Sequence, residues 1–119
     1  MAWELDNRGS IYSQLVDIIL RRIVTGVYPA GSKLDSVRDL ASEAGVNPNT
    51  MQRALTELER TGIISTQRTS GKYVTEDAAM IEEIRIKIAN DAIKKLLGEL
   101  KEIGFDSDEV VKLIEEVER

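Results

Sequence analysis

The chain has 119 residues, of which 42% are hydrophobic and 31% charged, and it contains no cysteine and no histidine. This length suits one compact domain, either alone or with a short appendage, and the missing cysteine excludes disulfides, thiol catalysis and cysteine metal sites. Because the commonest general base and metal ligand are also missing, we expect no catalytic residue, no metal site and no cofactor. No signal-peptide pattern opens the chain and no apolar run could span a membrane, which favours a cytoplasmic protein.

The net charge of −5 is distributed unevenly along the chain. Residues 1–75 carry nine Lys/Arg and eight Asp/Glu, for a net charge of +1, whereas residues 76–119 carry seven and thirteen, for −6. An acidic protein is at first a poor candidate for nucleic-acid binding, but the acidity lies in the last third of the chain. The asymmetry indicates two segments with different roles, 1–75 and 76–119, although a solvated acidic helix is an equally simple explanation of the second.

The first predicted helix begins after Ser10, whose hydroxyl suits an N-cap. Its apolar positions recur at helical spacing: Ile11, Leu15, Ile18, Ile19 and Ile23. Arg21 and Arg22 are expected to form a solvated helix end, and Gly26 is expected to end the helix. Pro and Gly in residues 27–31 then predict a turn.

Two further helices are predicted close together. One opens at Ser36 and ends at Gly45, which suits the left-handed residue after a helix. The next is capped by Asn47, has Pro48 at its first position and ends at Gly62. Their apolar stripes comprise Val37, Leu40, Ala41 and Ala44 in the first, and Met51, Ala54, Leu55 and Leu58 in the second. A short helix, a tight turn with Gly and a second helix are the layout of a helix-turn-helix.

Residues 63–66 and 72–75 are rich in strand-forming side chains, and the polar loop 67–71 between them contains Gly. This pattern predicts a β-hairpin, and a hairpin directly after a helix-turn-helix is a wing. The predicted fold class is therefore mostly α with a small β-hairpin wing: a winged helix-turn-helix over 1–75 with a two-helix segment over 76–119.

The segment 76–119 is predicted to form two amphipathic helices, with Gly98 inside the first and Gly104 at its end. Asp106 and Glu109 have capping-box spacing at the start of the second. Two helices this small make a poor core alone, so their apolar stripes dock on the winged helix, on a partner subunit or on both. We favour a homodimer, with these residues at its interface: Ile81, Ile84, Ile88, Leu96, Leu100, Val110 and Ile114.

Candidate DNA-binding residues lie on the predicted helix-turn-helix and wing. Asn49, Gln52, Arg53 and Thr56 fall opposite the buried face of the third helix, where amide side chains can pair with adenine and arginine with guanine or phosphate. Any helix surface carries such residues, but this one belongs to the second helix of a helix-turn-helix. The full predicted set is Ser36, Arg38, Asn47, Asn49, Thr50, Gln52, Arg53, Arg68, Gly71 and Lys72.

Arg38 and the two wing-tip members of this set have a simple structural alternative. Arg38 in the first turn of the second helix can form a surface ion pair with Asp35 or Asp39 instead of contacting DNA. The wing tip, with Arg68 and Gly71, suits the minor groove or phosphates because Gly permits a close backbone approach, but an ordinary hairpin turn has the same composition.

Seven motifs resemble a known family when taken together. They are IYSQL at 11–15, IVTG at 23–26, PAGSKL at 29–34, SVRDLA at 36–41, GVNPNTMQRAL at 45–55, ELERTGII at 57–64 and GKYV at 71–74. Over about residues 10–75 the chain resembles the DNA-binding domain of the GntR family. The Asn-Pro-Asn-Thr run and the short tail resemble its YtrA-type subfamily.

The resemblance implies a dimeric regulator, usually a repressor and often of a neighbouring transporter operon. It implies that Arg38 and the start of the third helix read bases, and that Gly71 approaches the minor groove. The chain departs from the family pattern at Asp35, where Pro is usual, and at residues 69–70, which replace a usual Gly. Pro48 and Asn49 replace the Arg and Thr of other subfamilies, so their base preference does not transfer.

Three hypotheses about function follow. A dimeric regulator of operator DNA should bind a palindrome with half-sites about one helical turn apart. A protein-interaction adaptor would keep the winged fold and use the acidic tail to dock a partner. A small enzyme is the least favoured because the chain lacks histidine and cysteine. Strongly salt-dependent DNA affinity separates the first two, and the sequence leaves open whether a small-molecule effector binds.

Overall fold

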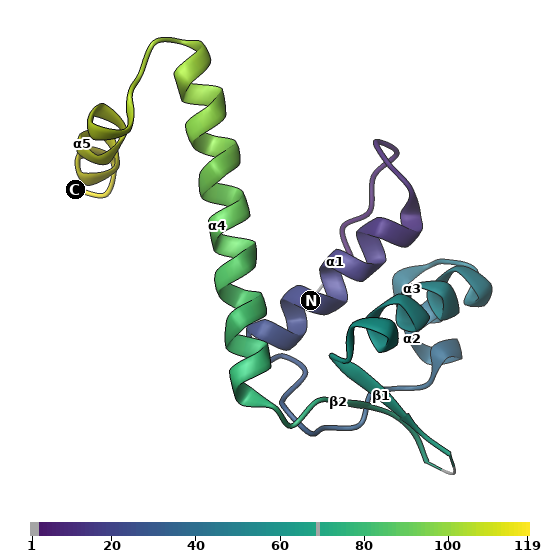
Figure 1. Cartoon of the computed structure of the whole chain (residues 1–119). Coiled ribbons are helices and arrows are strands. Elements are labelled where there is room, and N and C mark those ends of the chain that lie inside the picture. Colours follow the sequence, from purple (N-terminus) through teal and green to yellow (C-terminus); the bar gives the residue numbers. More distant parts are fainter. Residues whose placement is uncertain (1–2, 69) are drawn as a thin grey trace. The chain divides into compact units, whose positions relative to one another are not determined.

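The computed structural model describes residues 3–68 and 70–119, so Thr69 of the predicted wing loop lies outside the described residues. The described residues form α1 (Ile11–Val24), α2 (Val37–Ala44), α3 (Pro48–Thr61), β1 (Ile64–Gln67), β2 (Gly71–Val74), α4 (Ala78–Glu102) and α5 (Ser107–Val117) (Figure 1). This confirms the predicted fold class. Internal contacts divide the chain into two units, Met1–Glu83 and Ile84–Arg119.

The predicted caps of the first three helices are present. The Ser10 hydroxyl accepts from the Ser13 amide at 3.0 Å, and the Ser36 hydroxyl accepts from the Asp39 amide at 3.1 Å. The Asn47 side chain accepts from the Asn49 amide at 2.7 Å. Each cap satisfies one of the backbone donors that a helix start leaves free. α1 ends at Val24 with Thr25 as its C-cap, and the predicted Gly26 follows with a φ of +81°.

The turn between α2 and α3 is fixed by the left-handed conformation of Gly45, whose φ is +72°. The Gly45 amide donates to the Ser42 carbonyl at 3.2 Å, and the Val46 amide donates to the Ala41 carbonyl at 3.0 Å. These two bonds make a Schellman motif, which satisfies carbonyls at the end of α2 and turns the chain sharply. The turn therefore sets the angle at which α3 leaves α2.

The core of the first unit forms around α3, which contacts α1, α2 and β1 (Figure 1). Its apolar stripe is fully buried, as the sequence predicts. The buried apolar residues of this unit are Leu15, Ile19, Ile23, Leu34, Leu40, Ala41, Met51, Ala54, Leu55, Leu58, Ile63, Ile64 and Val74. Burying one such side chain contributes roughly 1.5–3 kcal/mol, so the core holds the helix-turn-helix rigid.

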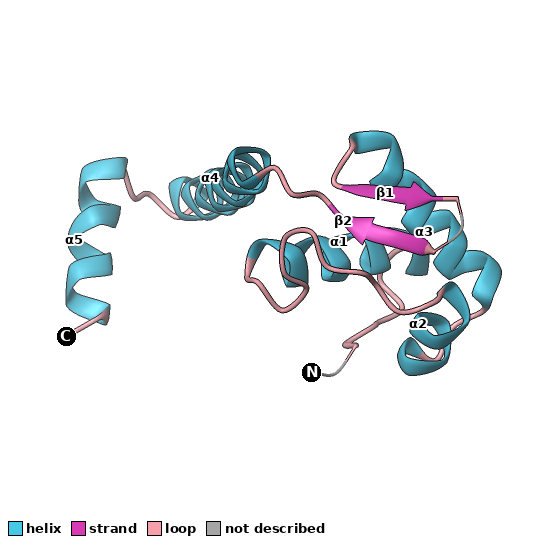
Figure 2. Ribbon diagram, turned by 90° about the horizontal axis from the view of Figure 1, so that it is seen from below, coloured by secondary structure: helices cyan, strands magenta, loops and turns pink. Residues whose placement is uncertain are grey.

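The hairpin pairs β1 with β2 antiparallel, with Ile64 opposite Val74 and Gln67 opposite Gly71 (Figure 2). Each strand lies one residue away from its predicted position. The sequence did not predict that the segment before α2 also pairs with β2. There the Leu34 amide donates to the Lys72 carbonyl and the Val74 amide to the Ser32 carbonyl, both at 2.9 Å. The wing is therefore bonded to the chain that leads into α2.

Arg22 corrects the prediction of a solvated end for α1. Arg21 is exposed and pairs with Asp17 at 2.8 Å, as expected of a surface residue. The Arg22 residue is only 5% exposed, and its guanidinium lies 4.2 Å from the centre of the Trp3 ring. It also donates to the Tyr28 hydroxyl at 2.8 Å. Arg22 thus joins the segment before α1 to the turn after it.

The second unit contains most of α4 together with α5. In α4 no described residue is buried, and in α5 the only buried one is Val110. Asp106 and Glu109 form the predicted capping box, because the Asp106 carboxylate accepts from the Glu109 amide at 2.9 Å and the Glu109 carboxylate accepts from the Asp106 amide at 3.2 Å. Among the described residues, no helix combines the length and apolar character that a membrane crossing requires.

Candidate nucleic-acid interface

The outer face of α3 presents the polar side chains that the sequence singled out. Asn49, Gln52, Arg53 and Thr56 are all exposed, because the opposite stripe of the helix lies in the core. Thr50 differs from them, since it is partly buried at the edge of this face. The face carries hydrogen-bond donors and acceptors of the kinds that read base edges in a major groove.

Two side chains on this face are held by neighbours. The Gln52 side-chain amide donates to the Thr56 hydroxyl at 3.1 Å. The Arg53 guanidinium lies 4.1 Å from the centre of the Tyr12 ring, which α1 supplies. Stacking of this kind orients an arginine while leaving its N–H groups free at the rim. The sequence did not predict this contact, which joins α1 to α3.

Arg38 is exposed in the first turn of α2, beside the capping residue Ser36. Within residues 3–68 and 70–119 it forms no ion pair with Asp35 or Asp39, the alternative that the sequence left open. Its guanidinium is therefore available to an external partner. Arg38 and the start of α3 lie on consecutive helices joined by the tight turn at Gly45.

The tip of the wing is exposed, whereas its base is attached to α3 by side-chain contacts. Arg68 is exposed beyond the end of β1, and Gly71 at the start of β2 has a φ of +109°, which favours glycine. Lys72 was predicted to face DNA, but its ammonium forms an ion pair with Glu59 of α3 and donates to Thr66 at 3.0 Å. Its side chain is 14% exposed. Lys72 thus ties the wing to α3 instead of offering a free cation.

The ion pair with Lys72 changes the pKa of Glu59. Partial burial alone would raise the pKa of this carboxyl, but hydrogen bonds from Lys72 and Thr66 lower it below its usual value. The direction shows that the folded chain favours the charged carboxylate. The pair connects the face of α3 to the base of the wing, so both contribute to one surface.

The predicted dimerisation residues fall into three groups. Leu96 and Ile114 are 40% and 45% exposed. Ile81, which lies in the first unit, and Ile84, Ile88 and Leu100 of α4 are partly buried. Val110 is only 3% exposed in the single chain, so it is a core residue and, contrary to the prediction, offers almost no surface to a partner.

An exposed apolar stripe along α4 was only partly predicted. Ile86 and Ile93 are 47% and 52% exposed but were absent from the predicted set. With the other members, the stripe advances by alternating steps of three and four residues through Ile86, Ala89, Ile93, Leu96 and the partly buried Leu100 to Ile103, directly after the end of α4. This is the a/d spacing of a heptad repeat, whose apolar seam packs against another helix. Counting heptads instead of single helical steps would have identified it.

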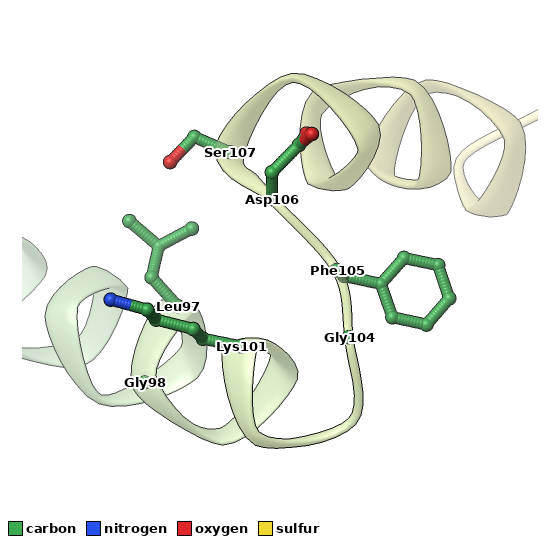
Figure 3. A pocket seen from close by; sticks show the side chains of 7 residues that line it. All are labelled: Leu97, Gly98, Lys101, Gly104, Phe105, Asp106 and Ser107. Carbon is green, nitrogen blue, oxygen red and sulfur yellow. The ribbon is translucent and has the colours of Figure 1, made fainter.

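A cavity of about 540 Å³ lies at the turn between α4 and α5 in the second unit. Leu97 of α4 and Ser107 of α5 face one another across it, while the Phe105 ring points away from Leu97 (Figure 3). Its one carboxylate, that of Asp106, already caps α5. Over residues 3–68 and 70–119, no cluster of acidic side chains has the arrangement of a metal site.

Comparisons with known proteins identify the family of the chain. The family described as "Bacterial regulatory proteins, gntR family" matches residues 11–74. The uncharacterized HTH-type transcriptional regulator YhcF of Bacillus subtilis is 36% identical over 86% of this chain and 84% of its own length. The HTH-type transcriptional repressor YtrA of the same organism is 33% identical over 96% of this chain and 90% of its own.

Among solved structures, a GntR family transcriptional regulator from Listeria monocytogenes is similar over nearly the whole chain. It is 42% identical, with a TM-score of 0.89, and the match covers 94% of this chain and 98% of that one. The similarity therefore includes the C-terminal helices as well as the helix-turn-helix and wing. The chain belongs to the gntR family of bacterial regulatory proteins.

Proposed function

We propose that the chain is a homodimeric repressor that binds palindromic operator DNA in the cytoplasm, without enzymatic activity. In this proposal α3 enters the major groove and the wing tip lies along the minor groove of the same half-site. The repressor role is taken from the similarity to YtrA, which is named a transcriptional repressor. In the same proposal, the regulated genes form a neighbouring operon that encodes a transporter.

The observation that carries the proposal is the exposed polar face of α3 together with Arg38 of α2, which forms no ion pair among the described residues. Asn49 and Gln52 supply the amide groups that pair with adenine edges, and the stacked Arg53 supplies a positioned guanidinium for guanine or phosphate. Arg38 supplies a second guanidinium one helix away. Arg68 and Gly71 place a cation and a close backbone approach at the wing tip.

The exposed heptad stripe of α4 supports the homodimer. A second copy of the same stripe would remove these side chains from water, which is the dominant favourable term in association. Two-fold symmetry in the dimer then requires two-fold symmetry in the operator, with half-site centres roughly 34–36 Å apart along the duplex. The acidic net charge of residues 76–119 is compatible with this arrangement because that segment is not proposed to contact DNA.

The test is selection of binding duplexes from a random pool with the full chain, followed by sequencing and titration of the enriched duplex at several salt concentrations. Enrichment of a palindrome, with affinity that falls steeply with salt, supports the proposal. A scrambled duplex of equal length and composition is the matched control. Absence of any enriched motif, with weak binding even at low salt, would contradict it and favour the protein-interaction adaptor.

A further inference from the structure

A groove of about 570 Å³ lies between the wing and the start of α2. One wall is formed by the segment leading into α2, and the other by the two strands of the wing. The lining residues used below are Lys33, Asp35, Ser36, Gly71 and Lys72. The groove is open, and each of its walls carries polar or charged side chains. It lies between the wing, which is proposed to bind the minor groove, and the start of α2, which carries Arg38, and a phosphate backbone would pass between these two elements.

Lys33 is fixed along one wall of this groove. Its backbone forms a β-bridge with Tyr73, and the next residue donates to the Lys72 carbonyl at 2.9 Å. The side chain then crosses the start of the wing strand, so that its Cε lies 3.3 Å from the position that a Cβ on Gly71 would occupy. Lys33 is exposed. The strand pairing therefore determines where the ammonium emerges.

The charges of the groove leave Lys33 as an unpaired cation. Of the two lysines that line it, Lys72 is neutralised by Glu59, whereas Lys33 forms no ion pair in the described part of the chain. Asp35 lines the same groove and places a carboxylate on the wall that leads into α2. A phosphate entering the groove would meet this negative charge, so a nearby free ammonium is needed to make the site favourable.

We propose that Lys33 binds a backbone phosphate of DNA in this groove. The inference rests on the proposed DNA-binding function and adds a residue outside the set predicted from sequence. A lysine ammonium is a compact charge that suits a phosphate oxygen, and phosphate contacts position a protein on the duplex without reading its sequence. Lys33 therefore positions the wing and α2 together on the duplex, whereas Arg38 and the face of α3 read the bases.

The position of Lys33 also gives Gly71 a second role. Its φ of +109° already favours glycine, and a Cβ at this residue would press on the Lys33 side chain. A substitution there would shift the ammonium as well as strain the strand. The wing glycine thus keeps open the path that Lys33 takes into the groove.

The test compares the salt dependence of DNA binding for the full chain and for Lys33→Gln. Loss of one phosphate contact makes the slope of log K against log salt shallower by about 0.9 per half-site, or about 1.8 for a dimer on a palindrome. Lys94→Gln makes the same charge change in the second unit and should leave the slope unchanged. Lys33→Arg keeps the charge and should retain most of the slope. Equal urea midpoints for the variants and the original chain establish that folding is intact.

The outcomes separate this inference from the proposed function. Equal weakening by Lys33→Gln on the selected and scrambled duplexes, with a shallower slope on both, supports it. An unchanged slope overturns it, and weakening confined to the selected duplex would assign Lys33 to base reading instead. Failure to enrich a palindrome would contradict the proposed function. The phosphate contact of Lys33 would still be tested in that case, because the salt slope is also measured on the scrambled duplex.

A scan of the duplex with neutral methylphosphonates locates the phosphate. One substitution in each half-site should weaken binding by the original chain and have no further effect on Lys33→Gln. If every neutral phosphate weakens the two proteins equally, Lys33 contacts none of them and the inference is wrong.

Discussion

Replacing Arg22 with alanine removes a buried cation that three parts of the first unit share. A hydrogen bond from a charged donor contributes about 1.5–3 kcal/mol, which applies to the bond to Tyr28 at 2.8 Å. A desolvated cation over an aromatic face contributes up to about 2 kcal/mol, which applies to Trp3 at 4.2 Å. Glu43, at 3.4 Å, has a side chain that is 45% exposed and stays hydrated when its partner is lost, so its pair adds little. We therefore expect Arg22→Ala to lower the free energy of unfolding by about 2–4 kcal/mol.

The neighbouring arginine provides a matched control. Arg21 lies in the same last turn of α1, so its replacement makes the same change in charge and in interaction with the helix dipole. Its side chain is 57% exposed, and its ion pair with Asp17 lies on the surface. Surface pairs contribute about 0–1 kcal/mol, so Arg21→Ala should cost at most that much.

Urea denaturation followed by far-ultraviolet circular dichroism measures both variants. Similar slopes with a lower midpoint for Arg22→Ala would show a change in stability of the folded state. Trp3 is the single tryptophan of the chain, and its emission should shift to the red in Arg22→Ala as the ring loses its partner. Equal destabilisation by the two substitutions would refute the reasoning, because only burial and partners distinguish them.

Three further predictions concern the interface, the dimer and the wing. Arg38→Ala should weaken binding to the selected duplex by about 1–3 kcal/mol and relax preference at one base pair, as measured by fluorescence anisotropy; unchanged affinity would remove Arg38 from base reading. Ile93→Glu should raise the dimer dissociation constant about tenfold or more in sedimentation equilibrium, whereas Lys94→Gln should not, and a dimer that persists would exclude this face of α4. Glu59→Gln should destabilise the chain at neutral pH. Because the folded pKa of Glu59 is lowered, its contribution is lost as the pH falls through that pKa, so the difference in urea midpoint should disappear in acid; a difference that persists would contradict the pairing with Lys72.

The features that the sequence predicts well are those determined by neighbouring residues. The caps at Ser10, Ser36 and Asn47 and the left-handed turn at Gly45 depend on a few consecutive positions, and each is found where expected. The buried stripe of α3 is local too, since helical spacing alone identifies it. For the same reason the helix-turn-helix and its outer face could be inferred before any tertiary contact was known.

The features that were missed depend on residues far apart in the chain. Arg22 and Lys72 both resemble surface cations in the sequence, and only folding brings them to Trp3 and Glu59. The bridge between Lys33 and Tyr73 joins segments forty residues apart, in a stretch whose Pro and Gly indicate only a turn. Such pairings are set by tertiary packing, which periodicity does not encode.

The hydrogen bonds between residues 32–34 and β2 have a consequence for regulation. The segment 32–34 leads directly into Ser36 and the start of α2. The wing therefore cannot move away from the helix-turn-helix without breaking backbone hydrogen bonds that each of the two segments donates to the other. In each subunit, the helix-turn-helix and the wing should move as one rigid body, with a constant distance between them. We therefore expect a regulatory signal to change how the two DNA-binding domains of a dimer are placed relative to each other along the duplex. We do not expect it to move the wing away from the helix-turn-helix within one subunit.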